Sequence, residues 1–167
     1  LVIDGNADGN VYALKARTGE KVWEFRLSKR GINVSPVLVD DTVYVAHSEE
    51  NIDENTMGRL VAINATGTGD VTATHERWRL SGLSFGFSSP MVHDGRVYIT
   101  DNSANLYAVD AGAGTVAWEF SIGTVGKSSA VWADGKIYVT EVNGNIRILQ
   151  PSPNGATELD HDELSMP

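Results

Sequence analysis

Asn105-Leu-Tyr-Ala-Val-Asp-Ala-Gly-Ala-Gly-Thr-Val-Ala-Trp-Glu-Phe120 decides the fold of this chain, because a close copy stands at Asn10-Val-Tyr-Ala-Leu-Lys-Ala-Arg-Thr-Gly-Glu-Lys-Val-Trp-Glu-Phe25. A looser copy runs from Arg59 to Leu80. A repeat with a period of tens of residues indicates a repeat architecture. The β-branched and aromatic residues that fill each copy, without sustained helical periodicity, predict strands.

One complete copy predicts four antiparallel strands. In the best-preserved copy, 88–120, His93-Asp94-Gly95 is a hairpin signal, and two further strands follow a polar turn and a Gly-rich turn. Four strands in about forty residues is the size of one propeller blade. The blades are predicted at about 1–25, 35–80, 88–120 and 128–161, the first without its innermost strand. We therefore expect an all-β propeller segment of nearly four blades, half of an eight-bladed ring.

The copies resemble the tryptophan-docking motif of the pyrroloquinoline-quinone (PQQ) repeat family, Ala-x-Asp-x-x-Thr-Gly-Lys-x-x-Trp. The matching residues are Ala13, Thr18, Gly19 and Trp23 in the first copy and Ala108, Asp110, Gly114 and Trp118 in the third. The second copy reaches Trp78 only after an insertion, and the fourth has lost the motif. We expect Gly19 and Gly114 to form the turn, Asp110 to bond its amides, and Trp23, Trp78 and Trp118 to dock blade on blade.

The resemblance implies one of two functions. One branch of the family binds PQQ with Ca²⁺ and oxidises alcohols or sugars, and many of its members stack a disulfide of adjacent cysteines on the quinone. The other branch has kept the propeller without the chemistry and includes the lipoprotein scaffold of outer-membrane protein assembly. This chain has no Cys, and no residue can be matched to the catalytic Asp or the calcium ligands. We expect a non-catalytic binding or scaffolding module of an exported bacterial protein, periplasmic or at the cell surface, without a cofactor. The alternative is a fragment of a PQQ-dependent dehydrogenase, with PQQ and Ca²⁺.

Charge and hydropathy exclude other partners. The net charge of −9 repels phosphate backbones and anionic membrane surfaces. No apolar run is long enough to span a membrane. Glu49, Glu50, Asp53 and Glu54 could offer oxygens to Ca²⁺, but they lack the spacing of a calcium loop, so a solvated acidic loop is expected. Gly82-Leu-Ser-Phe-Gly86 has the spacing of a hydrolase elbow but not the strand and helix around it.

The loops after the second and fourth strands of a blade are expected on one face. Its candidate binding residues are Arg30, Asn33, Phe85, Phe87 and Lys127. Asn33, Phe87 and Lys127 occupy one aligned position with three different residue types, which indicates either a binding surface for a protein or small molecule, or unconstrained drift.

Open blade edges predict self-association as one possible state. Two copies could close a ring about a two-fold axis, with residues near Leu164-Ser-Met166 of one copy beside Leu1-Val-Ile3 of the other. An open monomer is the alternative.

Overall fold

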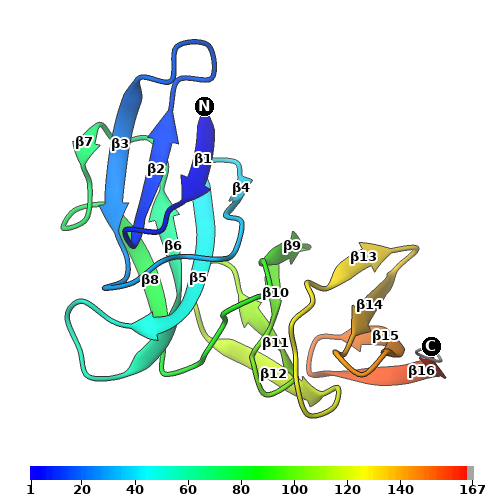
Figure 1. Ribbon diagram of the computed structural model, residues 1–167. Helices are drawn as coiled ribbons and strands as arrows, with labels where there is room; N and C mark the ends of the chain where they lie inside the picture. The colour runs from blue at the N-terminus through cyan, green and yellow to red at the C-terminus, as the bar shows by residue number, and fades with distance from the viewer. Residues whose placement is uncertain (165–167) are drawn as a thin grey trace. The chain divides into compact units, whose positions relative to one another are not determined.

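The computed structural model describes residues 1–164, in which the chain forms β-strands and turns but no helix. The strands make four sheets of four strands each (Figure 1). The predicted all-β propeller segment of about four blades is therefore confirmed. The chain divides into two compact units, Leu1–Gly86 and Phe87–Pro167, and each unit is described by itself below. Since the described residues contain no helix, none of them forms a membrane-spanning helix.

The first unit holds two blades. Their strands are β1 (Val2–Gly5), β2 (Asn10–Leu14), β3 (Lys21–Arg26), β4 (Val37–Val39), β5 (Thr42–Glu50), β6 (Met57–Asn64), β7 (Gly69–Asp70) and β8 (Glu76–Ser81). One sheet has the order β1-β2-β3-β7 and the other β4-β5-β6-β8. The first sheet contains a parallel pair, because β7 lies beside β3 with Trp23 opposite Gly69. The insertion before the fourth strand of the second blade thus covers the outer edge of the first blade.

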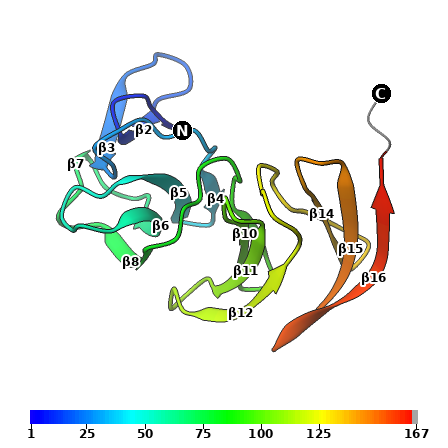
Figure 2. The ribbon, with the colours of Figure 1, turned by 60° about the horizontal axis from the view of Figure 1, so that its bottom comes forward.

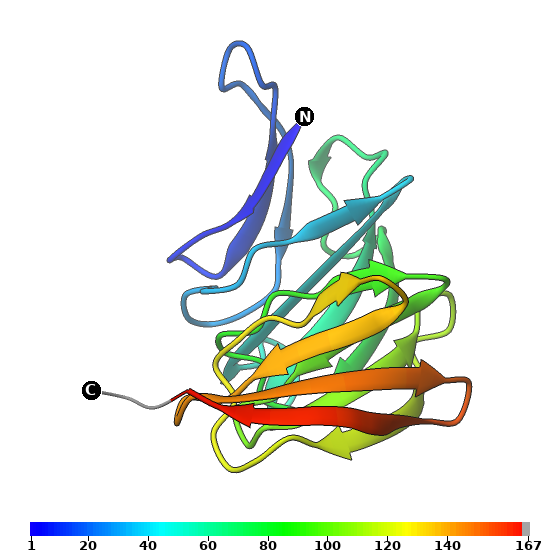
Figure 3. The same ribbon diagram turned by 90° about the vertical axis from the view of Figure 1, so that its right-hand side faces the viewer.

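The second unit holds the other two blades. Their strands are β9 (Met91–His93), β10 (Arg96–Thr100), β11 (Asn105–Asp110), β12 (Val116–Ser121), β13 (Val131–Ala133), β14 (Lys136–Thr140), β15 (Asn145–Ser152) and β16 (Gly155–Glu163). Figure 2 shows β10, β11 and β12 side by side in one sheet, and β14, β15 and β16 in the next. The hairpin of β15 and β16 is longer than that of β11 and β12, as Figure 3 shows at the C-terminal end.

All four blades share one irregularity between the third and fourth strands. The register of the pairing shifts after Ala13, Ala62, Ala108 and Ile148. A bulge at this place bends the strand and increases its twist. The small Ala of the motif therefore marks a bulge in three blades, a feature that the sequence pattern had not predicted.

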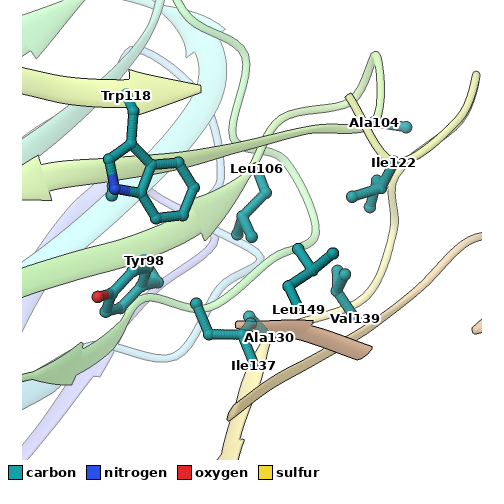
Figure 4. Close-up of a cluster of buried hydrophobic side chains, with 10 residues drawn as sticks. Tyr98, Ala104, Leu106, Trp118, Ile122, Ala130, Ile137, Val139 and Leu149 are labelled. Atoms are coloured by element: carbon teal, nitrogen blue, oxygen red, sulfur yellow. The ribbon is translucent and has the colours of Figure 1, made fainter. Parts of the chain in front are cut away.

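The core of the second unit lies between its two blades. Figure 4 shows Tyr98, Leu106 and Trp118 of one blade beside Ile137 and Leu149 of the other. The ring centroids of Tyr98 and Trp118 are 5.9 Å apart. The aligned Tyr44 and Trp78 of the first unit repeat this distance, 5.9 Å. The two Tyr–Trp pairs are the packing that the aligned aromatic residues of the repeat produce.

The predicted exchange of C-terminal residues between two copies depends on Ser165 and Met166. Both lie outside the described residues, so the ring-closing dimer stays a prediction.

Candidate functional site

The loops after the second strand are built on one turn in three blades. The turns begin at Asn6, Asp101 and Glu141, whose N–H groups donate to the carbonyl oxygens of Asn10, Asn105 and Asn145, each at 2.9 Å. The residues before these Asn, which are Gly9, Ala104 and Gly144, have positive φ. Their carbonyl oxygens accept from the backbone N–H groups that follow the fourth strand, at 2.8 to 3.0 Å. Both sets of loops thus lie at the same end of each blade and are fixed to each other.

In the first unit this arrangement brings Arg30 to the acidic insertion. The N–H of Lys29 donates to the carbonyl oxygen of Glu50 at 3.0 Å. The Arg30 guanidinium lies 3.7 Å from the Glu50 carboxylate, and both side chains are exposed. Asn33 is exposed on the same loop. Two of the predicted binding residues therefore stand on the surface here, and Arg30 lies beside an acidic side chain.

The acidic insertion is organised by arginines. Arg59, whose side chain is 2% exposed, donates to Asp53 at 2.5 Å and to Glu54 at 2.6 Å. Arg79 donates to Asp53 as well. Partial burial acts to raise the pKa of Asp53, but its hydrogen bonds with Arg59 and Arg79 leave that pKa below the usual value. The hydrogen bond from Arg59 lowers the pKa of Glu54.

The carboxylates considered as calcium ligands do not form a set. Glu49 and Glu50 lie at the end of β5, while Asp53 and Glu54 are bound by Arg59. Among residues 1–164, no three His, Asp or Glu side chains converge as metal ligands would. Glu49, Glu50, Asp53 and Glu54 therefore do not form a calcium site together, and we derive no step through PQQ.

A buried histidine lies beneath the insertion. His47 is 1% exposed, and its Nδ1 accepts a hydrogen bond from the N–H of Glu49 at 3.1 Å. Its Nε2 is buried without a hydrogen-bond partner within the described chain. Burial, together with the nearby Arg59 charge, lowers the pKa of His47 to about 4. The imidazole is therefore neutral at pH 7. The burial of His47 was not predicted from the pattern of the repeat.

Phe85 is a correction to the predicted binding surface. Its side chain is fully buried, and its N–H donates to the carbonyl oxygen of His47 at 3.4 Å. A large apolar ring in an inter-blade loop gains more by entering the core than by facing water. Phe85 therefore has no exposed surface to offer a partner.

In the second unit, Phe87 and Lys127 lie together. The Lys127 Nζ is 4.9 Å from the centroid of the Phe87 ring, and Phe87 is 48% exposed. The Ser88 hydroxyl accepts from the N–H of Thr100 at 3.1 Å and so fixes the backbone beside Phe87. The structure thus joins two predicted residues that are forty positions apart in the repeat.

Glu141 fixes the loop that carries Lys127. Its carboxylate accepts hydrogen bonds from the N–H groups of Thr124 and Val125 at 2.5 and 3.1 Å, and from the Asn145 amide at 3.2 Å. The Thr124 N–H, followed by the Asn145 amide, lowers the pKa of Glu141 to about 2. A side-chain cap of this kind holds the loop in one conformation.

A recess lies at the other end of the strands of the second unit. It has a volume of about 320 Å³ and is lined by Asp94, Arg96, Tyr98, Trp132, Pro151, Ser152 and Pro153. The lining residues come from the turn between β9 and β10, from β10 and β13, and from the end of β15 with the turn that follows it. None of the binding residues predicted from the sequence lines this recess.

The sequence matches the model of a family described as outer membrane protein assembly factor BamB over residues 7–166. The chain belongs to this family. No curated protein sequence matches the chain.

Solved structures with the same fold include proteins of several activities. BamB from Moraxella catarrhalis is 14% identical, with a TM-score of 0.70 over 96% of this chain and 44% of its own. Quinohemoprotein alcohol dehydrogenase ADHIIG from Pseudomonas putida HK5 is 14% identical, with a TM-score of 0.69 over 97% of this chain and 33% of its own. A chain of the mitotic checkpoint complex is 10% identical, with a TM-score of 0.76 over 95% of this chain and 48% of its own. The chain thus spans less than half the length of each, and at these identities the likeness shows the fold alone.

Proposed function

We propose that this chain is a non-catalytic binding module of an exported scaffold protein, and that it contacts a partner protein through the loops after the second and fourth strands. The observation that carries the proposal is the exposed pair of Phe87 and Lys127 on a backbone held by Ser88 and Glu141. An aromatic ring and a cation that are already in place lose little conformational entropy when a partner binds.

The repeat itself supports this proposal. The turn and its hydrogen bonds are the same in three of the four blades, whereas the aligned residues Asn33, Phe87 and Lys127 differ in size and charge. A rigid scaffold with variable exposed side chains is typical of repeat proteins that bind other macromolecules. Because the chain belongs to the BamB family, the proposal takes a specific form. The parent protein takes part in outer-membrane protein assembly, in the periplasm or at the cell surface.

Site-specific photo-crosslinking in the source cell tests it. A crosslinking amino acid at Phe87 or Lys127 of the full-length protein should capture one partner protein, whereas the same group at Val116 should not. Val116 is a suitable control because it is 41% exposed but begins β12, at the opposite end of the strands. Equal capture at Val116, or capture of nothing at both loop positions, would contradict the proposal.

The second candidate is a fragment of a PQQ-dependent dehydrogenase, favoured by the fold likeness to the quinohemoprotein alcohol dehydrogenase. Titration of the chain and its full-length parent with PQQ and Ca²⁺, followed by dye reduction with an alcohol or sugar, distinguishes the two. Tight binding with turnover would replace the scaffold proposal.

A further inference from the structure

The recess of the second unit is formed where the chain departs from its own repeat. Trp132 pairs with Ile137 in β14, and the residue at the same register in the second blade is Leu38, which pairs with Val43. The third blade has Val92 at this place. The repeat requires only an apolar residue at this position. Among the three blades that have this strand, only the fourth has a Trp there.

Two more departures from the repeat lie near Trp132, one on the third blade and one on the fourth. His93 pairs with Arg96, where the second blade has the small uncharged pair Val39 and Thr42. The fourth blade contributes Pro151-Ser-Pro153 where the first and third copies carry the docking motif. Trp132, Arg96 and Pro151-Ser-Pro153 line one recess, and His93 stacks on Trp132, although drift would scatter such departures.

The recess has an aromatic wall in a fixed position. The His93 ring stacks on Trp132 with centroids 3.8 Å apart, and the His93 Nε2 is 3.2 Å from the Asp94 carboxylate. Tyr98 lies 5.9 Å from Trp132, centroid to centroid, and is 5% exposed. These contacts hold the indole ring at the recess, and Pro151 and Pro153 add further apolar ring surface.

Arg96 supplies hydrogen-bond donors at the edge of this wall. Its Nη1 donates to the Asp110 Oδ2 at 3.0 Å. This is the one hydrogen bond that the guanidinium makes to the described residues. The other oxygen of Asp110 is taken by the N–H groups of Gly112 and Ala113 at 3.0 and 2.9 Å. A guanidinium carries five N–H donors in a planar fork, so most of them remain available to a ligand. The fork matches a carboxylate with two parallel hydrogen bonds.

We infer that this recess binds an aromatic carboxylate, with the ring against Trp132, Tyr98 and the prolines and the carboxylate on Arg96. The volume is at the small end of ligand pockets, about 300–1,000 Å³, which suits a group of the size of a single aromatic residue. Either a free aromatic acid or the C-terminal residue of a protein chain presents this chemistry. The inference does not depend on the proposed role of the loops, because the recess lies at the opposite end of the strands.

Binding of matched probes to the full chain tests the inference by calorimetry. N-acetyl-L-phenylalanine should bind, its amide should bind about tenfold more weakly because a charge-assisted pair is lost, and N-acetyl-L-alanine should bind more weakly than either. A tetrapeptide that ends in a free Phe carboxylate identifies the source. Tighter binding than the acid supports a protein C-terminus, and weaker binding supports a small acid.

Three variants assign the contacts. Arg96→Gln should weaken binding of the acid about tenfold and leave the amide unchanged. Trp132→Leu, which introduces the residue type of the second blade, should weaken binding of both probes. Lys136→Gln removes a cation from the same register position of the fourth blade, outside the recess lining, and should change neither. Thermal unfolding shows that each variant is folded. No binding of the acid, equal binding of acid and amide, or unchanged binding by folded Arg96→Gln would overturn the inference.

Discussion

The indole Nε1 of Trp118 donates a hydrogen bond to the carbonyl oxygen of Ser152, 3.1 Å away in the following blade. Trp23 makes the equivalent bond in the first unit, 3.0 Å from its Nε1 to the carbonyl oxygen of Ala65. Both carbonyls stand at the end of the third strand of the next blade. The ring is buried and its one polar atom is satisfied, so a single side chain supplies both packing and a directional contact between neighbouring blades.

This geometry predicts a graded loss of stability at Trp118. Trp118→Phe keeps a ring but leaves the Ser152 carbonyl without its donor, and should lower the free energy of unfolding by about 1–2 kcal/mol. Trp118→Ala also removes the ring from the core and should cost about 3–5 kcal/mol. Urea denaturation measures both. Trp132→Phe, at a half-buried Trp of the same unit, is the control, and an equal loss there would contradict the role of the indole hydrogen bond.

Arg59 and Arg79 both bind Asp53 but differ in burial, which predicts different effects of their removal. The side chain of Arg59 is 2% exposed and that of Arg79 is 40% exposed. Arg59→Ala leaves a cavity and two carboxylates without their buried donor, and should cost about 2–4 kcal/mol. Arg79→Ala should cost less than about 1 kcal/mol, because exposed ion pairs contribute little. Hydrogen exchange should show the segment 48–57 opening in Arg59→Ala alone. Similar losses for the two variants would contradict this account.

The sequence predicted those parts of the fold that depend on neighbours along the chain. Alternating residues and Gly-rich turns are local signals, so the strands and turns of the third blade could be placed before the structure was known. Strand β7 could not, because its pairing with β3 joins Gly69 to Trp23 across the three strands that lie between them in the chain. The burial of Phe85 depends on the contact of its loop with His47. The recess requires the turn at Asp94 to meet the end of β15 at Pro151. Its only signal in the sequence is the departure of Trp132 and its neighbours from the repeat.

His47 predicts a loss of stability in mild acid. Its pKa is about 4 in the folded chain against an ordinary 6.5, so the unfolded chain binds the proton more readily. Stability from the neutral imidazole is complete above about pH 6.5, decreases as the pH falls toward 4, and does not change further below it. The decrease should be on the order of 2–3 kcal/mol.

His47→Asn removes this titration and introduces the residue that the first blade has at the aligned position, Asn6. Urea denaturation from pH 7 to pH 4 should show wild type losing more stability than His47→Asn across that interval. Parallel pH profiles for the two proteins would show that His47 is not the responsible group.

Glu141 predicts a second pH dependence, at lower pH and of a different origin. Hydrogen bonds from the Thr124 N–H and the Asn145 amide hold its pKa at about 2, below the ordinary 4.5. The carboxylate therefore stabilises the fold fully above about pH 4.5, and its contribution is lost as the pH falls toward 2.

Glu141→Gln keeps an acceptor oxygen but no charge, so its stability should be lower than that of wild type at pH 6. The difference should shrink steadily between pH 4.5 and pH 2 in guanidinium or thermal unfolding. Hydrogen exchange at Val125, which donates to this carboxylate at 3.1 Å, should quicken in the variant at pH 6. If the stability difference stays constant over this range, the charge of Glu141 does not hold the loop that carries Lys127.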